Sequence, residues 1–190
     1  MFTEKSGWVA AAALSLLLWV LWIWVPNDAI SFQRSAIAGG QWWRMITGNL
    51  AHTNGWHLLL NLCGLWVLVT LFSRDLDAAR LLLVLGSGAL GVTIGIWLLC
   101  PQTQWYMGLS GALHGLFVWG LMRDLYFKRR GARLLLLGFA IKLLLDWLGG
   151  GESSPSAALI GARVHVGSHL LGSMAGLVLA LVSLSWPARR

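Results

Sequence analysis

Charged residues are scarce in this sequence. Only 11% of its 190 residues are Asp, Glu, Lys or Arg, whereas 57% are hydrophobic. A soluble globular domain carries about 25% charged residues. Because a chain this short leaves much of its surface exposed, it cannot bury so much apolar surface in a core of its own. The composition therefore excludes an ordinary soluble domain, and we expect most of the surface to face lipid.

Cysteine is also nearly absent. Cys63 and Cys100 lie in apolar surroundings, at a spacing that suits neither a metal site nor a redox motif. This excludes a disulfide framework, and we expect both residues to be small members of the core. The net charge is +7, but the basic residues lie mainly beside hydrophobic runs, where they act as topology signals. We therefore expect the lipid bilayer, and no nucleic acid, as a partner.

Six apolar segments have about the length that a transmembrane helix needs. The first is too long for the hydrophobic region of a signal peptide, and no small-residue cleavage site follows it. The sequence therefore predicts an all-α polytopic membrane protein, a single domain over residues 1–190 with six transmembrane helices. The expected helices cover residues 7–25, 56–72, 78–99, 110–127, 132–148 and 164–186.

The distribution of Lys and Arg predicts the orientation of these helices. With the N-terminus inside, ten basic residues fall on the cytoplasmic side and three in outer connections, Arg34, Arg44 and Arg163. Both termini are then cytoplasmic. The outer connection 26–55 is long and rich in Trp, which indicates a segment that dips into the interface. The connection 149–163 opens with three glycines and is expected to be a mobile loop that covers the outer side.

Two positions indicate nucleophilic catalysis. Ser110 lies in the tetrapeptide Gly108-Leu-Ser-Gly111 at the expected start of a helix, where free N–H groups can stabilise an oxyanion. An N-cap is the simpler role for a lone serine. His169 is followed by Gly172 and Gly176, which form a face that lets a second helix approach closely. A neutral histidine brought to Ser110 in this way can accept its proton.

Other polar residues in the apolar segments have simpler explanations when taken alone. His57 and Asn61 share one helix face and either donate to an oxyanion or form hydrogen bonds between helices. Lys142 and Asp146, also spaced i and i+4, are expected to neutralise each other, so we leave this pair out of the catalytic set. His165 lies one turn before His169 on the same face, but it lacks glycines at the matching spacing.

Four motifs follow one another along the chain: Trp43-Arg44, His57-x-x-x-Asn61, Gly108-x-Ser110-Gly111, and His169-x-x-Gly172-x-x-x-Gly176. Together and in this order, they resemble the rhomboid family of intramembrane serine proteases. The resemblance implies a six-helix fold with a water-filled cavity open to the outer face. It also implies a Ser–His dyad without a required acid, and no cofactor or metal. The oxyanion would be held by the Ser110 N–H, His57 and Asn61, with Gly108 beside them.

His114, one turn after Ser110, departs from the Tyr found in many rhomboids and resembles the rhombosortase subgroup. That resemblance implies a bacterial inner-membrane enzyme whose active site opens to the periplasm. Its substrates would be membrane-anchored proteins with a C-terminal Gly-Gly, a transmembrane helix and a basic tail. His114 either orients His169 or competes with it for the serine proton. The alternatives are a metal-dependent protease, a non-catalytic rhomboid-like protein that binds transmembrane helices, and a small transporter or channel.

Overall fold

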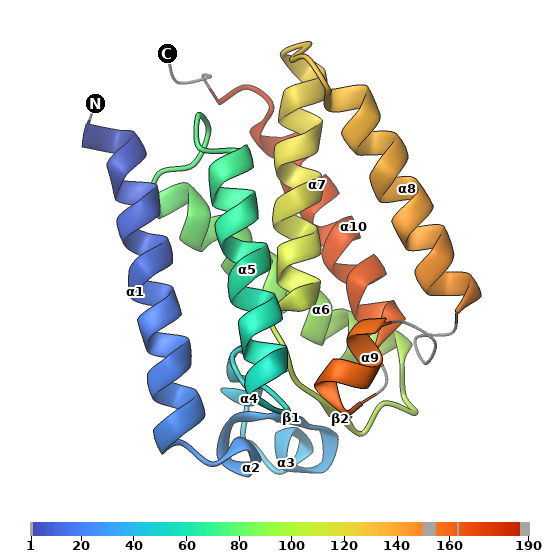
Figure 1. Cartoon of the computed structure of the whole chain (residues 1–190). Helices are drawn as coiled ribbons and strands as arrows, with labels where there is room; N and C mark the ends of the chain where they lie inside the picture. The colour runs from blue at the N-terminus through green and yellow to red at the C-terminus, as the bar shows by residue number, and fades with distance from the viewer. Residues whose placement is uncertain (1, 150–154, 163, 187–190) are drawn as a thin grey trace.

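The structure is a computed structural model, and it describes residues 2–149, 155–162 and 164–186. Six long helices run between the two ends of a bundle, and short elements gather at one end (Figure 1). The long helices are α1 (Phe2–Trp24), α5 (Gly55–Leu71), α6 (Ala78–Leu99), α7 (Ser110–Tyr126), α8 (Ala132–Leu148) and α10 (Val166–Ser183). The short elements are α2 (Asn27–Ile30), β1 (Phe32–Gln33), α3 (Arg34–Ala38), α4 (Arg44–Thr47), β2 (Trp105–Tyr106) and α9 (Pro155–Ile160).

Three of the described helices are long and apolar enough to cross a membrane, over Lys5–Trp24, Ala78–Leu99 and Val166–Ser183. The Gly55–Leu71 helix is apolar but shorter. α1 carries exposed large apolar side chains along its length, and in α8 only Ala132 is buried. An apolar helix surface that no protein packs against suits lipid. Cys63 is exposed and Cys100 is half-buried, so the prediction that both belong to the core is wrong.

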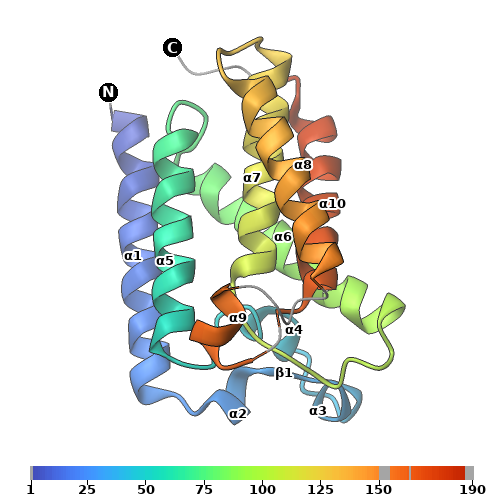
Figure 2. The ribbon, with the colours of Figure 1, turned by 45° about the vertical axis from the view of Figure 1, so that its right-hand side comes forward.

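The helix starts have local causes in the sequence. Asn54 accepts a hydrogen bond from the His57 N–H at 2.9 Å, and Asp77 accepts one from the Arg80 N–H at 2.7 Å. These side chains satisfy N–H groups that the first turns of α5 and α6 leave free. Gly131, with φ +85°, turns the chain into α8. The connection between α5 and α6 and the connection between α7 and α8 lie at the same end of the bundle as the start of α1 (Figure 2).

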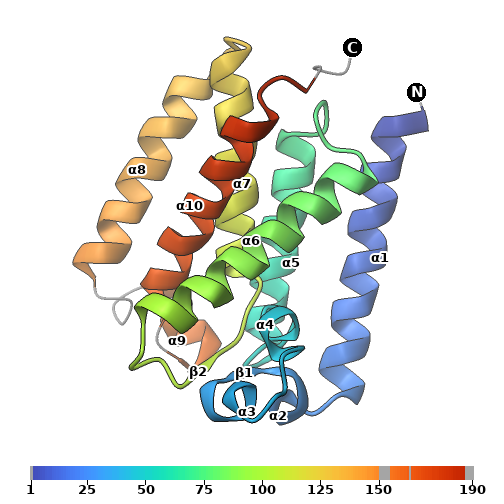
Figure 3. The same cartoon turned by 180° about the vertical axis from the view of Figure 1, so that it is seen from behind.

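Helices α7 and α10 form the centre of the bundle, with α6 crossing them on the rear side (Figure 3). They approach through glycines. A Cβ atom at Gly172 would lie 1.9 Å from the Gly111 carbonyl oxygen, and one at Gly176 would lie 2.0 Å from the Gly115 carbonyl oxygen. Only glycine permits this distance. The small-residue packing between these two segments, predicted from the glycine spacing, is present.

The long connection before α5 folds against the strand that precedes α7. β1 pairs with β2 in antiparallel register, Phe32 opposite Tyr106 and Gln33 opposite Trp105. The connection is therefore a structured element that supports the start of α7, rather than a flexible tether. At the other end of the bundle, a network of ion pairs joins α7 to the connection between α5 and α6.

In that network Arg123 Nη2 lies 3.0 Å from Asp75 Oδ1, and both side chains are fully buried. Arg129 contacts the same carboxylate and also Asp124. We expect Asp75→Ala to lower the free energy of unfolding by about 3–5 kcal/mol, because it leaves a buried guanidinium without its charge partner. The midpoint of thermal unfolding in detergent micelles measures this. The exposed Arg130→Ala is the control, with a change within about 0.5 kcal/mol, and equal midpoints for the two variants would contradict the expectation.

Candidate active site

Ser110 is the first residue of α7, where its N–H precedes the first hydrogen bond within the helix. In the turn before it, both backbone groups of Gly108 form hydrogen bonds. The Gly108 N–H donates to the Gly48 carbonyl at 3.1 Å, and the Gly108 carbonyl accepts from the Tyr106 hydroxyl at 2.8 Å. Burial raises the pKa of Tyr106, so this phenol stays protonated and can donate. Gly108 has φ +121°, and a Cβ there would lie 2.6 Å from the His57 ring, so glycine is required.

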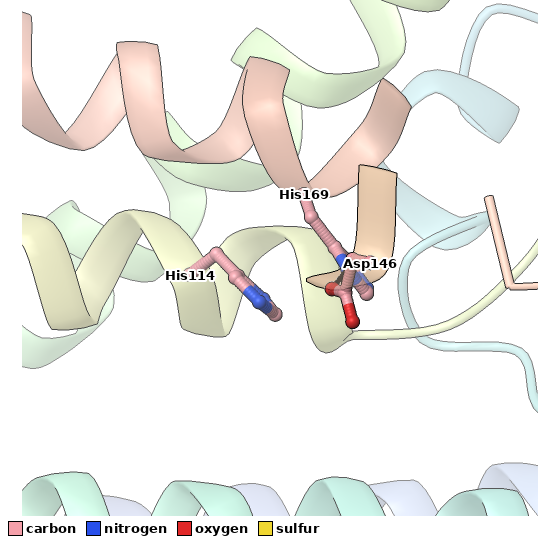
Figure 4. A group of neighbouring side chains, drawn as sticks. All are labelled: His114, Asp146 and His169. Carbon is pink, nitrogen blue, oxygen red and sulfur yellow. Dashed lines mark hydrogen bonds and ion pairs between the residues drawn. The ribbon is translucent and has the colours of Figure 1, made fainter. Parts of the chain in front are cut away.

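His169, on α10, contacts two groups with its two ring nitrogens. Its Nε2 lies 3.2 Å from Ser110 Oγ, and its Nδ1 lies 3.2 Å from Asp146 Oδ2 on α8. The ring is 6% exposed, so it is shielded on most sides by protein. His169 and Asp146 point toward each other from different helices, with His114 beside them (Figure 4). The hydroxyl, the imidazole and the carboxylate thus form a continuous chain of contacts.

His114 stacks on His169, with ring centroids 3.9 Å apart and an interplanar angle of 10°. Its Nδ1 lies 2.7 Å from the Ser110 carbonyl oxygen, and its Nε2 lies 2.5 Å from Lys142 Nζ. A carbonyl only accepts and an ammonium group only donates. We therefore infer that Nδ1 carries the proton and that the Nε2 lone pair is taken by Lys142. In this arrangement His114 has no free nitrogen to accept the Ser110 proton.

Three side chains of the kinds that bind metal ions lie close enough together to hold one. The ligand atoms of His114, Asp146 and His169 are all within 4.8 Å of one another (Figure 4). Lys142 Nζ lies between two of them, 2.5 Å from His114 Nε2 and 2.6 Å from Asp146 Oδ2. The positive charge that a metal would bring to these ligands is therefore already supplied by an ammonium group.

A cavity of about 880 Å³ opens beside this cluster. Asn61 Nδ2 is a buried donor with no partner among the described residues, and Asn61 lines the cavity. His57 Nδ1 lies 3.3 Å from the Thr53 backbone nitrogen and 3.1 Å from Thr53 Oγ1, and Nε2 is the other ring nitrogen of His57. Asn61 and His57 thus place an amide donor and an imidazole ring beside the turn that leads to Ser110. Other lining residues include Leu60, Trp105, Tyr106, Met107, His114, Lys142, Trp147, Ile160, Val164, His165 and His169.

Most of the chain matches a known protein family. Residues 39–186, which include every element of the site, match the Rhomboid domain. The chain belongs to the rhomboid family. The family and the apolar helices identify it as a multi-pass helical membrane protein, whose substrates would lie in the bilayer.

Three relatives extend this finding. The chain is 28% identical over 193 residues to “Putative rhomboid protease YdcA” of Bacillus subtilis (strain 168), covering 94% of this chain and 88% of that protein. It is 27% identical to Rhomboid protease GluP of the same organism, over 57% of this chain and 24% of that protein. It is 25% identical to the chloroplastic Rhomboid-like protein 11 of Arabidopsis thaliana, over 77% of this chain and 54% of that protein. The relatives named as proteases support an intramembrane serine protease activity.

The rhomboid motifs in the first connection lie outside the cavity lining. Arg44 is buried, and its guanidinium donates to the carbonyls of Ser31 and Asp28 at 2.8 and 2.7 Å. Trp43 is 53% exposed, and its indole N–H lies 3.5 Å from the Ala29 carbonyl. Both residues therefore shape the connection and do not contact Ser110. Gly108, expected beside the oxyanion donors, has its N–H bonded to Gly48, so its contribution is steric.

Two further histidines, His165 and His52, have contacts that differ from those of His169. His165 caps α10, where its Nδ1 accepts the Ser168 N–H at 3.0 Å and its Nε2 lies 3.0 Å from Thr103 Oγ1. Burial lowers the pKa of His165 and lowers that of His52 to about 3, so both are neutral at physiological pH. His52 lies against the His57 ring in the connection before α5. Neither residue contacts Ser110, in contrast to His169.

Asp146 and Lys142 belong to the candidate site, although the sequence predicted only an ion pair between them. Their ion pair is present, with Lys142 Nζ 2.6 Å from Asp146 Oδ2, but it is not confined to α8. Asp146 also contacts His169, and Lys142 also contacts His114. The rule that charged residues inside a membrane helix are functional by default marks both positions, but it does not show which residues of other helices they contact.

Proposed function

We propose that this rhomboid protein is an intramembrane serine endopeptidase in which Ser110 is the nucleophile and His169 the general base. The observation that carries the proposal is the 3.2 Å contact between Ser110 Oγ and His169 Nε2 at the wall of a cavity. A base within hydrogen-bond reach of a hydroxyl is what nucleophilic catalysis requires.

The reaction is acyl transfer in two halves. Ser110 Oγ attacks the peptide carbonyl carbon, and its proton moves to His169 Nε2. As the C–N bond breaks, the same proton passes to the leaving amine, and the acyl group stays on Ser110. A water then gives its proton to His169 Nε2, its oxygen bonds to the acyl carbon, and the Ser110 oxygen leaves with that proton.

The developing oxyanion would be held by the Ser110 N–H together with the side chains of His57 and Asn61. Each such donor contributes about 3 kcal/mol to the transition state in serine proteases. Support for Asn61 comes from its buried amide nitrogen, which has no partner in the described part of the chain. A buried donor without a partner is costly unless it serves a ligand or a transition state.

We expect Asn61→Ala to lower kcat by about 10²-fold, with little change in the unfolding midpoint, because no protein hydrogen bond of this amide nitrogen is lost. Steady-state cleavage of a transmembrane reporter in liposomes measures kcat. Thr70→Ala on the same helix is the matched control, since its hydroxyl donates to the Trp66 carbonyl one turn earlier, which is its one hydrogen bond within the described residues. A kcat for Asn61→Ala equal to that of Thr70→Ala would contradict the oxyanion role.

For the membrane arrangement, we propose six spans in a bacterial inner membrane, with both termini in the cytoplasm and the cavity toward the periplasm. The distribution of basic residues supports this orientation. The connections with Arg74 and with Lys128–Arg130 lie at the end of the bundle opposite to β2 and α9, which contribute residues to the cavity lining (Figure 1). Of the other residues used for orientation, Arg163, Arg189 and Arg190 lie outside the described residues.

For the substrate, we propose membrane-anchored proteins with a C-terminal Gly-Gly, a transmembrane helix and a basic tail. The resemblance of the Ser110–Gly115 run to the rhombosortase subgroup supports this class. A glycine pair also makes local unwinding of the substrate helix easier, because glycine is a poor helix former. Unwinding exposes the scissile bond to Ser110.

The test uses the full chain in liposomes with such a Gly-Gly reporter. We expect cleavage that persists in the presence of a chelator and stops after treatment with a fluorophosphonate. Loss of cleavage in the chelator alone would indicate a metal-dependent protease. Binding of the reporter without any cleavage would favour the non-catalytic alternative.

A further inference from the structure

We propose that Asp146 is a positioning residue for His169, so that the hydrolytic unit is a Ser–His–Asp chain spread over α7, α10 and α8. The inference rests on the proposed function, because the orientation of the base matters only if Ser110 attacks a substrate. The resemblance to rhomboids implies a dyad without an acid, so this chain adds a group that the resemblance does not predict.

The tautomer of His169 follows from its two contacts. A carboxylate only accepts hydrogen bonds, so the His169 Nδ1 that lies 3.2 Å from Asp146 Oδ2 must carry a proton. Its Nε2 then has a free lone pair, and this atom lies 3.2 Å from Ser110 Oγ. The carboxylate therefore holds the imidazole in the one tautomer that can accept the serine proton.

Lys142 restrains both the Asp146 carboxylate and the His114 ring. It donates to Asp146 Oδ2 at 2.6 Å and to His114 Nε2 at 2.5 Å, and His114 stacks on His169. Lys142 Nζ is also 3.5 Å from His169 Nδ1, but that nitrogen already donates to Asp146. One ammonium group thus restrains both neighbours of the catalytic ring.

The role of Asp146 changes as the proton moves. When Ser110 Oγ bonds to the substrate carbon, its proton arrives on His169 Nε2 and the ring becomes an imidazolium. Asp146 then faces a full positive charge, and the hydrogen bond to the carboxylate becomes a hydrogen-bonded ion pair. The proton on Nδ1 stays on the ring throughout, and only the Nε2 proton passes to the leaving amine.

The test compares Asp146→Asn with the wild-type chain in liposomes on a transmembrane reporter. The amide has nearly the shape of the carboxylate, but it can donate to Nδ1 and so favour the tautomer with the proton on Nε2. We expect kcat to fall by about 10²- to 10⁴-fold, with KM changed by less than about 3-fold. In the ¹⁵N NMR spectrum of the micelle-bound protein, the His169 signals should shift from the Nδ1–H toward the Nε2–H tautomer, which a merely structural role would not cause.

Asp124→Asn is the matched control. Its carboxylate pairs with Arg129 at the other end of the bundle, 2.7 Å away, so its loss should affect stability but neither kcat nor the His169 tautomer. Wild-type kcat in both Asp146→Asn and Asp146→Ala, with Ser110→Ala inactive, would overturn the positioning role alone. Undiminished cleavage by Ser110→Ala would instead overturn the proposed function, and the positioning role with it.

Discussion

Replacing Ser110 with alanine is expected to lower kcat by about four to six orders of magnitude, the range seen when a serine protease loses its nucleophile. The reason is geometric, because the Ser110 hydroxyl is the group that lies 3.2 Å from His169 Nε2. Substrate binding should be retained, since the change removes one oxygen atom at the cavity wall. The measurement is the rate of reporter cleavage in liposomes, together with the KM of any residual activity.

Ser173→Ala is the matched control for this variant. Its hydroxyl lies in α10 and donates to the His169 carbonyl at 2.7 Å, which is a local contact within the helix. We expect its kcat to stay within about 3-fold of wild type, as for a substitution that removes no transition-state interaction. Equal rates for Ser110→Ala and the wild-type chain would show that another group attacks the substrate.

Gly172→Val should disrupt the molecule at the contact between its two central helices. A Cβ at this position would lie 1.9 Å from the Gly111 carbonyl oxygen and 3.3 Å from the Gly111 Cα, both of them backbone atoms that cannot rotate away. α10 must then move off α7, which separates His169 from Ser110. We expect the free energy of unfolding to fall by at least about 3 kcal/mol, and cleavage to be lost.

Gly86→Ala provides the comparison, since a Cβ at Gly86 would meet nothing within 4 Å. Alanine should leave activity unchanged and stabilise α6 by up to about 1 kcal/mol through its higher helix propensity. Unfolding midpoints in detergent micelles separate the two variants. A wild-type midpoint and rate for Gly172→Val would mean that the close approach of α7 and α10 is not needed.

The long helices could be predicted from the sequence because their length and apolar character are local properties. The expected segment 78–99 coincides with α6, and 132–148 coincides with α8. The first helix begins at Phe2 instead of residue 7. The apolar run predicts only the part of the helix that suits lipid, and the more polar turn before it is helical as well. Composition does not by itself determine the number of membrane spans, because α5, α7 and α8 have only 17 residues each.

The connection 149–163 shows how local signals can be outweighed. Its glycines and serines gave no sign of a helix, but α9 forms over Pro155–Ile160, while residues 150–154 and 163 lie outside the described residues. Proline is favoured at the first position of a helix, and Gly161, with φ +63°, follows the last. Thr53 and Asn54 donate to the carbonyls at the end of α9, which only the folded chain brings together.

In the site, the contact between Ser110 and His169 could be anticipated because glycine spacing determines which helix faces meet. The part played by Asp146 could not. Its spacing from Lys142 accounts for both charges within one helix, and nothing local shows that α8 turns this pair toward His169. His114 was ambiguous for the same reason, since its two hydrogen-bond partners lie on different helices.

The most direct measurement of the central claim is the position of a covalent label from a fluorophosphonate, mapped by mass spectrometry on the full chain in micelles. Such a probe bonds to a serine oxygen that a neighbouring base activates. The account predicts one label on the peptide that contains Ser110, absent in Ser110→Ala and formed far more slowly in His169→Ala. A label on another residue, or an unchanged labelling rate in His169→Ala, would contradict the assignment of Ser110 and His169.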